Sequence, residues 1–186
     1  MKHATGLAGL IGLLNCVSAV AQATDSPGAH MFERMRTLVG EWKGTYQWSG
    51  GQNASGNLRA TYYLTGDGSA LVEDLIMGDA PTMTTVYHLD GSDLRMTHFC
   101  AAKNQPRLKA VHFDEGTGVA NFQFIDVTNA AAHRAYVDAF AIQILDADNV
   151  SLKFEFGGSS SKTATETIVL KRVAAAAPRS SSDSSH

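Results

Sequence analysis

The chain has 186 residues, of which 44% are hydrophobic and 18% charged, a balance that fits one globular domain or two small ones and excludes wholesale disorder. Its net charge of −3 offers no basic surface for nucleic acid, so we expect no nucleic-acid partner. Two cysteines are too few for a disulfide-rich scaffold or a four-cysteine zinc site.

Residues 1–23 have the pattern of a secretory signal peptide. Residues 4–20 carry no charge, and the sequence AQA at 21–23 provides the small residues that signal peptidase recognises. A membrane anchor is one alternative, although glycine and alanine dilute the apolar run. Lipidation at Cys16 is another. Removal of the signal peptide would leave no stable membrane span, and we expect a periplasmic or secreted protein.

The C-terminal residues 174–186 read AAAAPRSSSDSSH and contain no periodic apolar face. A serine-rich segment of this kind cannot build a packed core, so we predict a disordered tail. The folded domain is therefore expected over residues 26–173.

The folded domain begins with features of a short helix. Ser26 is a good N-cap and Pro27 suits the first helical position. Apolar residues then recur at helical spacing, at Met31, Phe32, Met35, Leu38 and Val39. Gly40 is a typical helix stop. These features predict one amphipathic helix.

After Gly40 the hydrophobic period changes to two, which is typical of β-strands. Ten strands are predicted between short turns, at residues 42–48, 59–64, 70–77, 83–89, 94–101, 107–113, 119–127, 135–145, 150–156 and 164–172. Short connections require antiparallel neighbours, and ten such strands favour a closed barrel. We predict an all-β, lipocalin-like up-and-down barrel with the helix plugging one end and room for a small ligand. A two-sheet sandwich is the alternative.

Alternation along the strands assigns candidate residues to the barrel interior. His98 and Cys100 share a face with two apolar residues of their strand, so both should point inward. The same pattern places Trp42 and Tyr87 inside. Glu73 shares a face with two leucines, although the branched apolar residues on the other face make the opposite orientation equally plausible.

A polar turn follows this strand and contains Asn104, Gln105 and, at its end, Arg107. With His98 and Cys100 it could orient the polar head of a ligand at the barrel mouth. Alternatively, the turn residues bond the backbone and Arg107 pairs with an acid. His98 and Cys100 supply only two ligands of the three or four that zinc needs, so we expect no metal site.

Four segments resemble known families. The sequence LVGEWKG at 38–44 resembles the opening of lipocalin-like and nitrobindin-like barrels. The sequences GSALVE at 68–73, VYHLDG at 86–91 and MTHFCAAKNQPR at 96–107 resemble bacterial proteins of unknown function of the DUF1579 type. The resemblance covers most of residues 32–172.

These resemblances imply a fold and a group rather than an activity. The nitrobindin resemblance implies haem held by a histidine late in the chain, where His133 is the candidate before the tail. The cofactor is otherwise unknown.

Three functions are consistent with these features. We favour an exported barrel that binds a small hydrophobic or amphipathic molecule in its interior, with contacts from Trp42, Glu73, Tyr87, His98, Cys100, Asn104, Gln105 and Arg107. A small enzyme is the first alternative, with His98 as base or Cys100 as nucleophile. The second is a structural or interaction module with a filled core. The sequence contains no nucleophile elbow, phosphate loop or dinucleotide fingerprint.

Overall fold

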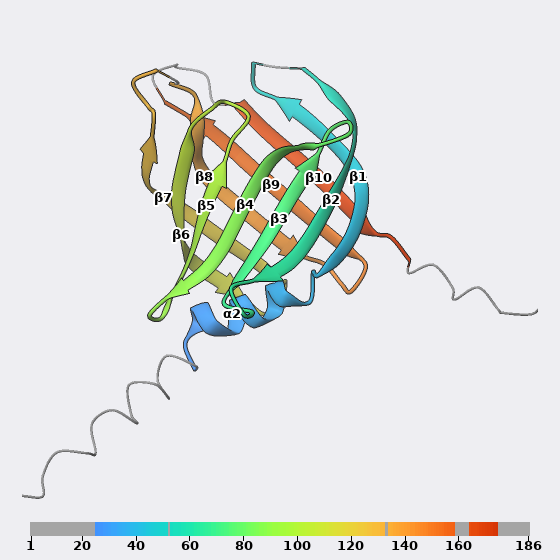
Figure 1. The fold of residues 1–186 in the computed structure, drawn as a ribbon, viewed down its shortest axis with the longest axis vertical. Helices are drawn as coiled ribbons and strands as arrows, with labels where there is room; N and C mark the ends of the chain where they lie inside the picture. Colours follow the sequence, from blue (N-terminus) through green and yellow to red (C-terminus); the bar gives the residue numbers. More distant parts are fainter. Residues whose placement is uncertain (1–24, 52, 133, 159–163, 175–186) are drawn as a thin grey trace, which may run out of the picture.

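The computed structural model describes residues 25–51, 53–132, 134–158 and 164–174, which form one helix and ten strands (Figure 1). The elements are α2 (Pro27–Arg36), β1 (Gly40–Ser49), β2 (Ser55–Thr65), β3 (Ala70–Ile76), β4 (Pro81–Asp90), β5 (Asp93–Phe99), β6 (Gln105–Asp114), β7 (Val119–Thr128), β8 (Tyr136–Ile144), β9 (Asn149–Gly157) and β10 (Ala164–Arg172). The predicted signal peptide and residues 175–186 of the predicted tail lie outside this part of the chain. No helix within it has the length and apolar character needed to cross a membrane.

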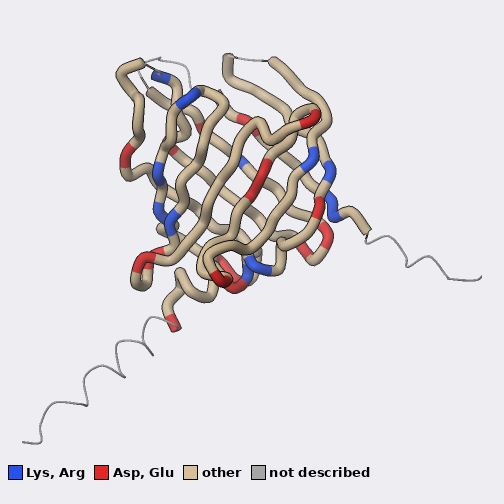
Figure 2. The backbone as a smooth tube through the Cα atoms, in the orientation of Figure 1, with Lys and Arg blue, Asp and Glu red and all other residues tan. Residues whose placement is uncertain are grey.

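Each strand pairs antiparallel with the next, and β1 pairs with β10 to close a barrel. This confirms the predicted ten-stranded antiparallel barrel and excludes the sandwich. In Figure 1 α2 lies across one end, called here the helix end. The odd-numbered strands end, and the even-numbered strands begin, at the opposite end of the barrel, called here the open end. Acidic residues gather in the turns of the helix end (Figure 2).

Helix α2 begins as its sequence predicts. The Ser26 hydroxyl accepts a hydrogen bond from the backbone N–H of Ala29 at 3.1 Å, which satisfies one of the free donors of the first turn. The helix ends at Arg36, earlier than the predicted stop at Gly40. The Thr37 hydroxyl donates to the Arg34 carbonyl at 2.7 Å and caps the last turn. Gly40, with φ of +134°, instead turns the chain into β1.

The segment 38–44 seals the helix end of the barrel. The Trp42 indole N–H donates to the Leu38 carbonyl at 2.8 Å, and the Arg172 guanidinium lies 4.2 Å from the indole centroid. Gly44 has no room for a side chain, since a Cβ there would lie 1.8 Å from the Val169 carbonyl oxygen. The LVGEWKG motif therefore has a structural explanation.

The middle of the barrel is filled by aromatic side chains. Phe140 lies 5.5 Å from Phe122 and 4.7 Å from Phe154, measured between ring centroids, and Tyr87 packs against Phe122. All four are almost completely buried. The expected central ligand space is therefore occupied by the core itself, at the close packing usual for protein interiors.

Candidate functional site

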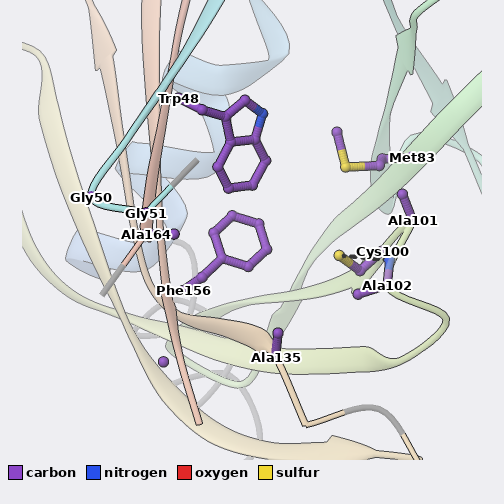
Figure 3. A pocket seen from close by; sticks show the side chains of 11 residues that line it. Trp48, Gly50, Gly51, Met83, Cys100, Ala101, Ala102, Ala135, Phe156 and Ala164 are labelled. Carbon is purple, nitrogen blue, oxygen red and sulfur yellow. Dashed lines mark hydrogen bonds between the residues drawn. The ribbon is translucent and has the colours of Figure 1, made fainter. Parts of the chain in front are cut away.

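A pocket of about 400 Å³ lies at the open end of the barrel (Figure 3). Its wall is mostly apolar and is built from residues at or next to the strand ends of the open end. The lining residues are Trp48, Gly50, Gly51, Met83, Cys100, Ala101, Ala102, Ala135, Phe156, Gly157 and Ala164. A concave apolar site of this size fits a small molecule.

Two aromatic rings form one wall of the pocket. Trp48 near the end of β1 and Phe156 near the end of β9 lie 4.9 Å apart between centroids, with a tilt of 41°. Figure 3 shows them across the pocket from Met83 and Cys100. Sequence reasoning did not single out Trp48 or Phe156 as site residues. The sequence feature that could have identified them is an aromatic residue close to the end of a strand, on its inner face.

Cys100 lines the opposite wall and lacks the surroundings of a nucleophile. Burial raises the pKa of its thiol, the backbone N–H of Ala102 lowers it, and the charge of Glu166 adds to the rise. The N–H of Ala102 lies 3.5 Å from the sulfur. Activated cysteines have a lowered pKa, so this thiol is mainly protonated at neutral pH.

His98 lies one inner-facing position deeper than Cys100 and is completely buried, which confirms its predicted orientation. Its Nδ1 lies 2.8 Å from the Thr85 hydroxyl, and its ring packs on Phe154 at 5.1 Å. Burial lowers the pKa of His98 to about 4, so the ring is neutral at physiological pH. Its Nε2 is buried and has no hydrogen-bond partner in the described part of the chain.

Glu73 also points inward, which resolves the orientation that the sequence left open. Its carboxylate accepts hydrogen bonds from Tyr62 at 2.7 Å and Tyr87 at 3.1 Å, and Thr85 lies 3.4 Å away. Burial raises the pKa of Glu73 to about 7, although these hydroxyls partly oppose the rise. Glu73 therefore belongs to a satisfied network in the core.

These buried polar residues lie in one row across the barrel wall. Tyr62, Glu73, Thr85 and His98 are opposite one another in the successive ladders of β2 to β5. Thr85 has a single hydroxyl proton, so it cannot donate to both Glu73 and His98. When Thr85 donates to Glu73, Nδ1 of His98 carries the proton that the hydroxyl accepts.

Sequence reasoning missed a second buried acid, Glu166 on β10. It is completely buried, and neither carboxylate oxygen has a hydrogen-bond partner within the described residues. Burial raises its pKa to about 7. The sequence signal was the alternation of Ala164, Glu166, Ile168 and Leu170 on one strand face, where an acid stands among apolar residues.

The polar turn after β5 is only partly directed toward the pocket. Asn104 is buried and its side-chain amide donates to the Ala135 carbonyl at 2.7 Å, which joins two loops of the pocket rim. Arg107 instead lies on the outer face, where its Nε donates to Asp126 at 2.6 Å, and the Gln105 side chain bonds to Thr128.

The predicted cluster is therefore divided between two faces of the barrel. Pro106 and Leu108 of β6 are buried, so Arg107 between them must face outward. His98, Cys100 and Asn104 remain together near the open end. The second interpretation of the turn agrees with this geometry for Asn104, which bonds a backbone carbonyl, and for Arg107, which pairs with an acid. Gln105 instead bonds a side chain.

Two other predicted site residues lie away from the pocket. Trp42 packs at the helix end, and Tyr87 is part of the aromatic core. Neither lines the pocket. Their inward orientation is confirmed, but their position gives them a role in packing.

The described residues do not fit a haem held by histidine. No histidine lines the described pocket wall, because His98 lies deeper and packs on Phe154. His133, the candidate from the nitrobindin resemblance, lies outside the described residues. No three His, Cys, Asp or Glu side chains of the described chain gather into a metal-binding group.

Comparisons with known proteins identify similar folds. No family model matches the chain, and no curated protein sequence matches it. A protein of unknown function of the DUF3598 family from Nostoc punctiforme PCC 73102 is 13% identical with a TM-score of 0.53, over 75% of this chain and 48% of its own. Rv2717c from M. tuberculosis is 13% identical with a TM-score of 0.54, over 77% of this chain and 98% of its own. The chain spans about half the length of the DUF3598 protein. These likenesses show a shared barrel fold.

Proposed function

We propose that this protein binds a small hydrophobic or amphipathic molecule in the pocket at the open end. The observation that carries the proposal is the contrast between the two parts of the barrel interior. Aromatic side chains fill the middle, whereas about 400 Å³ of mostly apolar space is left between Trp48, Phe156, Met83 and Cys100. An apolar pocket next to a packed core is a usual arrangement for ligand binding.

The two alternatives have less support. The raised pKa of the Cys100 thiol and the lowered pKa of His98 are both opposite to the shifts that would make a nucleophile or a strong base. A filled structural module agrees with the packed middle of the barrel, but it gives no reason for the pocket.

Export and family membership are part of the proposal. The pattern of residues 1–23 supports a signal peptide and a periplasmic or secreted protein. The sequence at 96–107 supports membership of the DUF1579-type group. Intact mass measurement of protein from the exported fraction tests the first point, because cleavage after Ala23 removes 23 residues from the chain.

A neutral apolar dye tests the binding proposal. N-phenylnaphthylamine fluoresces more strongly in apolar surroundings, so we expect a saturable rise on titration with the wild-type protein. The Ala164→Phe variant places a ring in the pocket and should abolish that rise. Thr167→Phe places the same ring on the exposed face of the same strand and is the matched control. Absence of saturable binding to the wild type, or its persistence in Ala164→Phe, would refute the pocket as the site.

A further inference from the structure

We propose that Glu166 binds the protonated amine of an amphipathic ligand whose apolar part fills the open-end pocket. This inference rests on the proposed function, because it names the chemistry of the molecule that the pocket takes. It concerns a residue that none of the sequence motifs identified.

Glu166 lies directly behind the pocket wall. Ala164, which lines the pocket, precedes it by two residues, so both side chains are on the inner face of β10. Trp48, which also lines the pocket, is opposite Glu166 in the β1–β10 ladder. Phe154 is opposite it on β9 and belongs to the packed core. The carboxylate therefore occupies the boundary between the pocket and the core.

The carboxylate lacks the partners that a buried acid requires. Both oxygens are buried without a hydrogen-bond partner among the described residues, and no ion pair there involves Glu166. The Trp48 indole opposes the rise in the pKa of Glu166, although it does not reach hydrogen-bonding geometry. A buried polar group without a partner carries a large desolvation cost.

Glu73 offers a comparison, because it is a buried acid of the same barrel whose hydrogen bonds are formed within the core. Both glutamates are completely buried. Glu73 receives hydrogen bonds from two tyrosine hydroxyls and a nearby threonine, whereas Glu166 receives none. The difference indicates that the partner of Glu166 comes from outside the described chain, on the side where the pocket lies.

The chemistry of the pocket selects an amine as that partner. A protonated amine supplies N–H donors and a charge that compensates the carboxylate. The rings of Trp48 and Phe156 add a favourable surface for a cation. No Lys, Arg or His lines the described wall, so a ligand carboxylate would find no opposite charge among the described residues and would lie near the like charge of Glu166. The ligand class is therefore an alkyl or aryl amine.

Three ligands with the same hydrocarbon chain test the assignment. Octylamine, octanol and octanoate are titrated at neutral pH, where an alkylamine is protonated as lysine is, and displacement of N-phenylnaphthylamine is measured. The proteins are wild type, Glu166→Gln, and Glu155→Gln as a control. Glu155 is an acid of the neighbouring strand that faces outward and pairs with Lys153.

We expect the wild type to bind octylamine at least about tenfold more tightly than octanol, as a charge-assisted hydrogen bond predicts. Glu166→Gln should lose this preference and keep its affinity for octanol, while Glu155→Gln should behave as wild type. Equal binding of octylamine and octanol by the wild type, or an unchanged preference in Glu166→Gln, would overturn the amine assignment and leave the pocket proposal standing. Failure of dye and octanol alike to bind the wild type would overturn both.

Discussion

Replacing Glu166 by glutamine should change how the stability of the protein depends on pH. The pKa of Glu166 is raised by burial from 4.5 to about 7 in the folded protein. Between these values the unfolded chain has lost the proton that the folded protein keeps. The free energy of unfolding therefore falls as pH rises through this window, and it levels off above about pH 7.

The size of the effect follows from the two pKa values. The difference between 4.5 and about 7 corresponds to about 3 kcal/mol of stability that is present below the unfolded-state pKa and absent above the folded-state pKa. Glutamine has no proton to lose, so the variant keeps this contribution. Relative to the wild type, Glu166→Gln should gain about 3 kcal/mol between the acidic and the alkaline end of the window.

Urea unfolding followed by circular dichroism measures this difference across a series of buffers. Glu73, whose pKa is also raised to about 7 by burial, contributes a slope to both proteins and cancels in the comparison. The outward-facing variant Glu155→Gln should follow the wild-type curve. Parallel curves for wild type and Glu166→Gln would show that the carboxylate is solvated or paired in solution, and the reasoning from its burial would fail.

Two further predictions concern the other buried groups. Glu73→Leu leaves the buried hydroxyls of Tyr62 and Tyr87 without their acceptor, so it should lower the free energy of unfolding by about 1–3 kcal/mol in urea titrations; an unchanged value would contradict the network. Cys100, whose pKa is raised mainly by burial, should react slowly with a thiol reagent in the native protein and quickly in urea. Rapid labelling of the native protein would restore the nucleophile hypothesis.

The sequence predicts the fold because local patterns and short loops constrain it. The last strand is predicted at residues 164–172 and observed as Ala164–Arg172. The helix start at Ser26 and the inward orientation of His98 and Cys100 are also confirmed. Ten short antiparallel strands leave few arrangements other than a closed barrel, so fold class follows from alternation and turn residues alone.

The location of the site depends on which interior positions are filled, and alternation does not reveal that. Trp42 and Trp48 share a strand face, yet the first seals the helix end while the second lines the pocket. Arg107 is close in sequence to Cys100 but lies on the outer face. The inward and outward positions of β6 cannot be counted on from those of β5, because an irregular turn separates the two strands. The pocket residues come from strand ends that meet only once the barrel has closed.

Hydrogen bonds from Arg172 on the last strand to the segment after helix α2 constrain the order in which the chain can fold. Its guanidinium donates to the carbonyls of Thr37 and Val39, at sequence separations of 135 and 133 residues. The edge of β1 that does not pair with β2 also has no partner until β10, at the end of the described chain, is available. Closure requires contacts of very long range, which makes it a slow step. Incomplete chains would expose β1 as a free edge, so synthesis that stalls before residue 172 should favour aggregation.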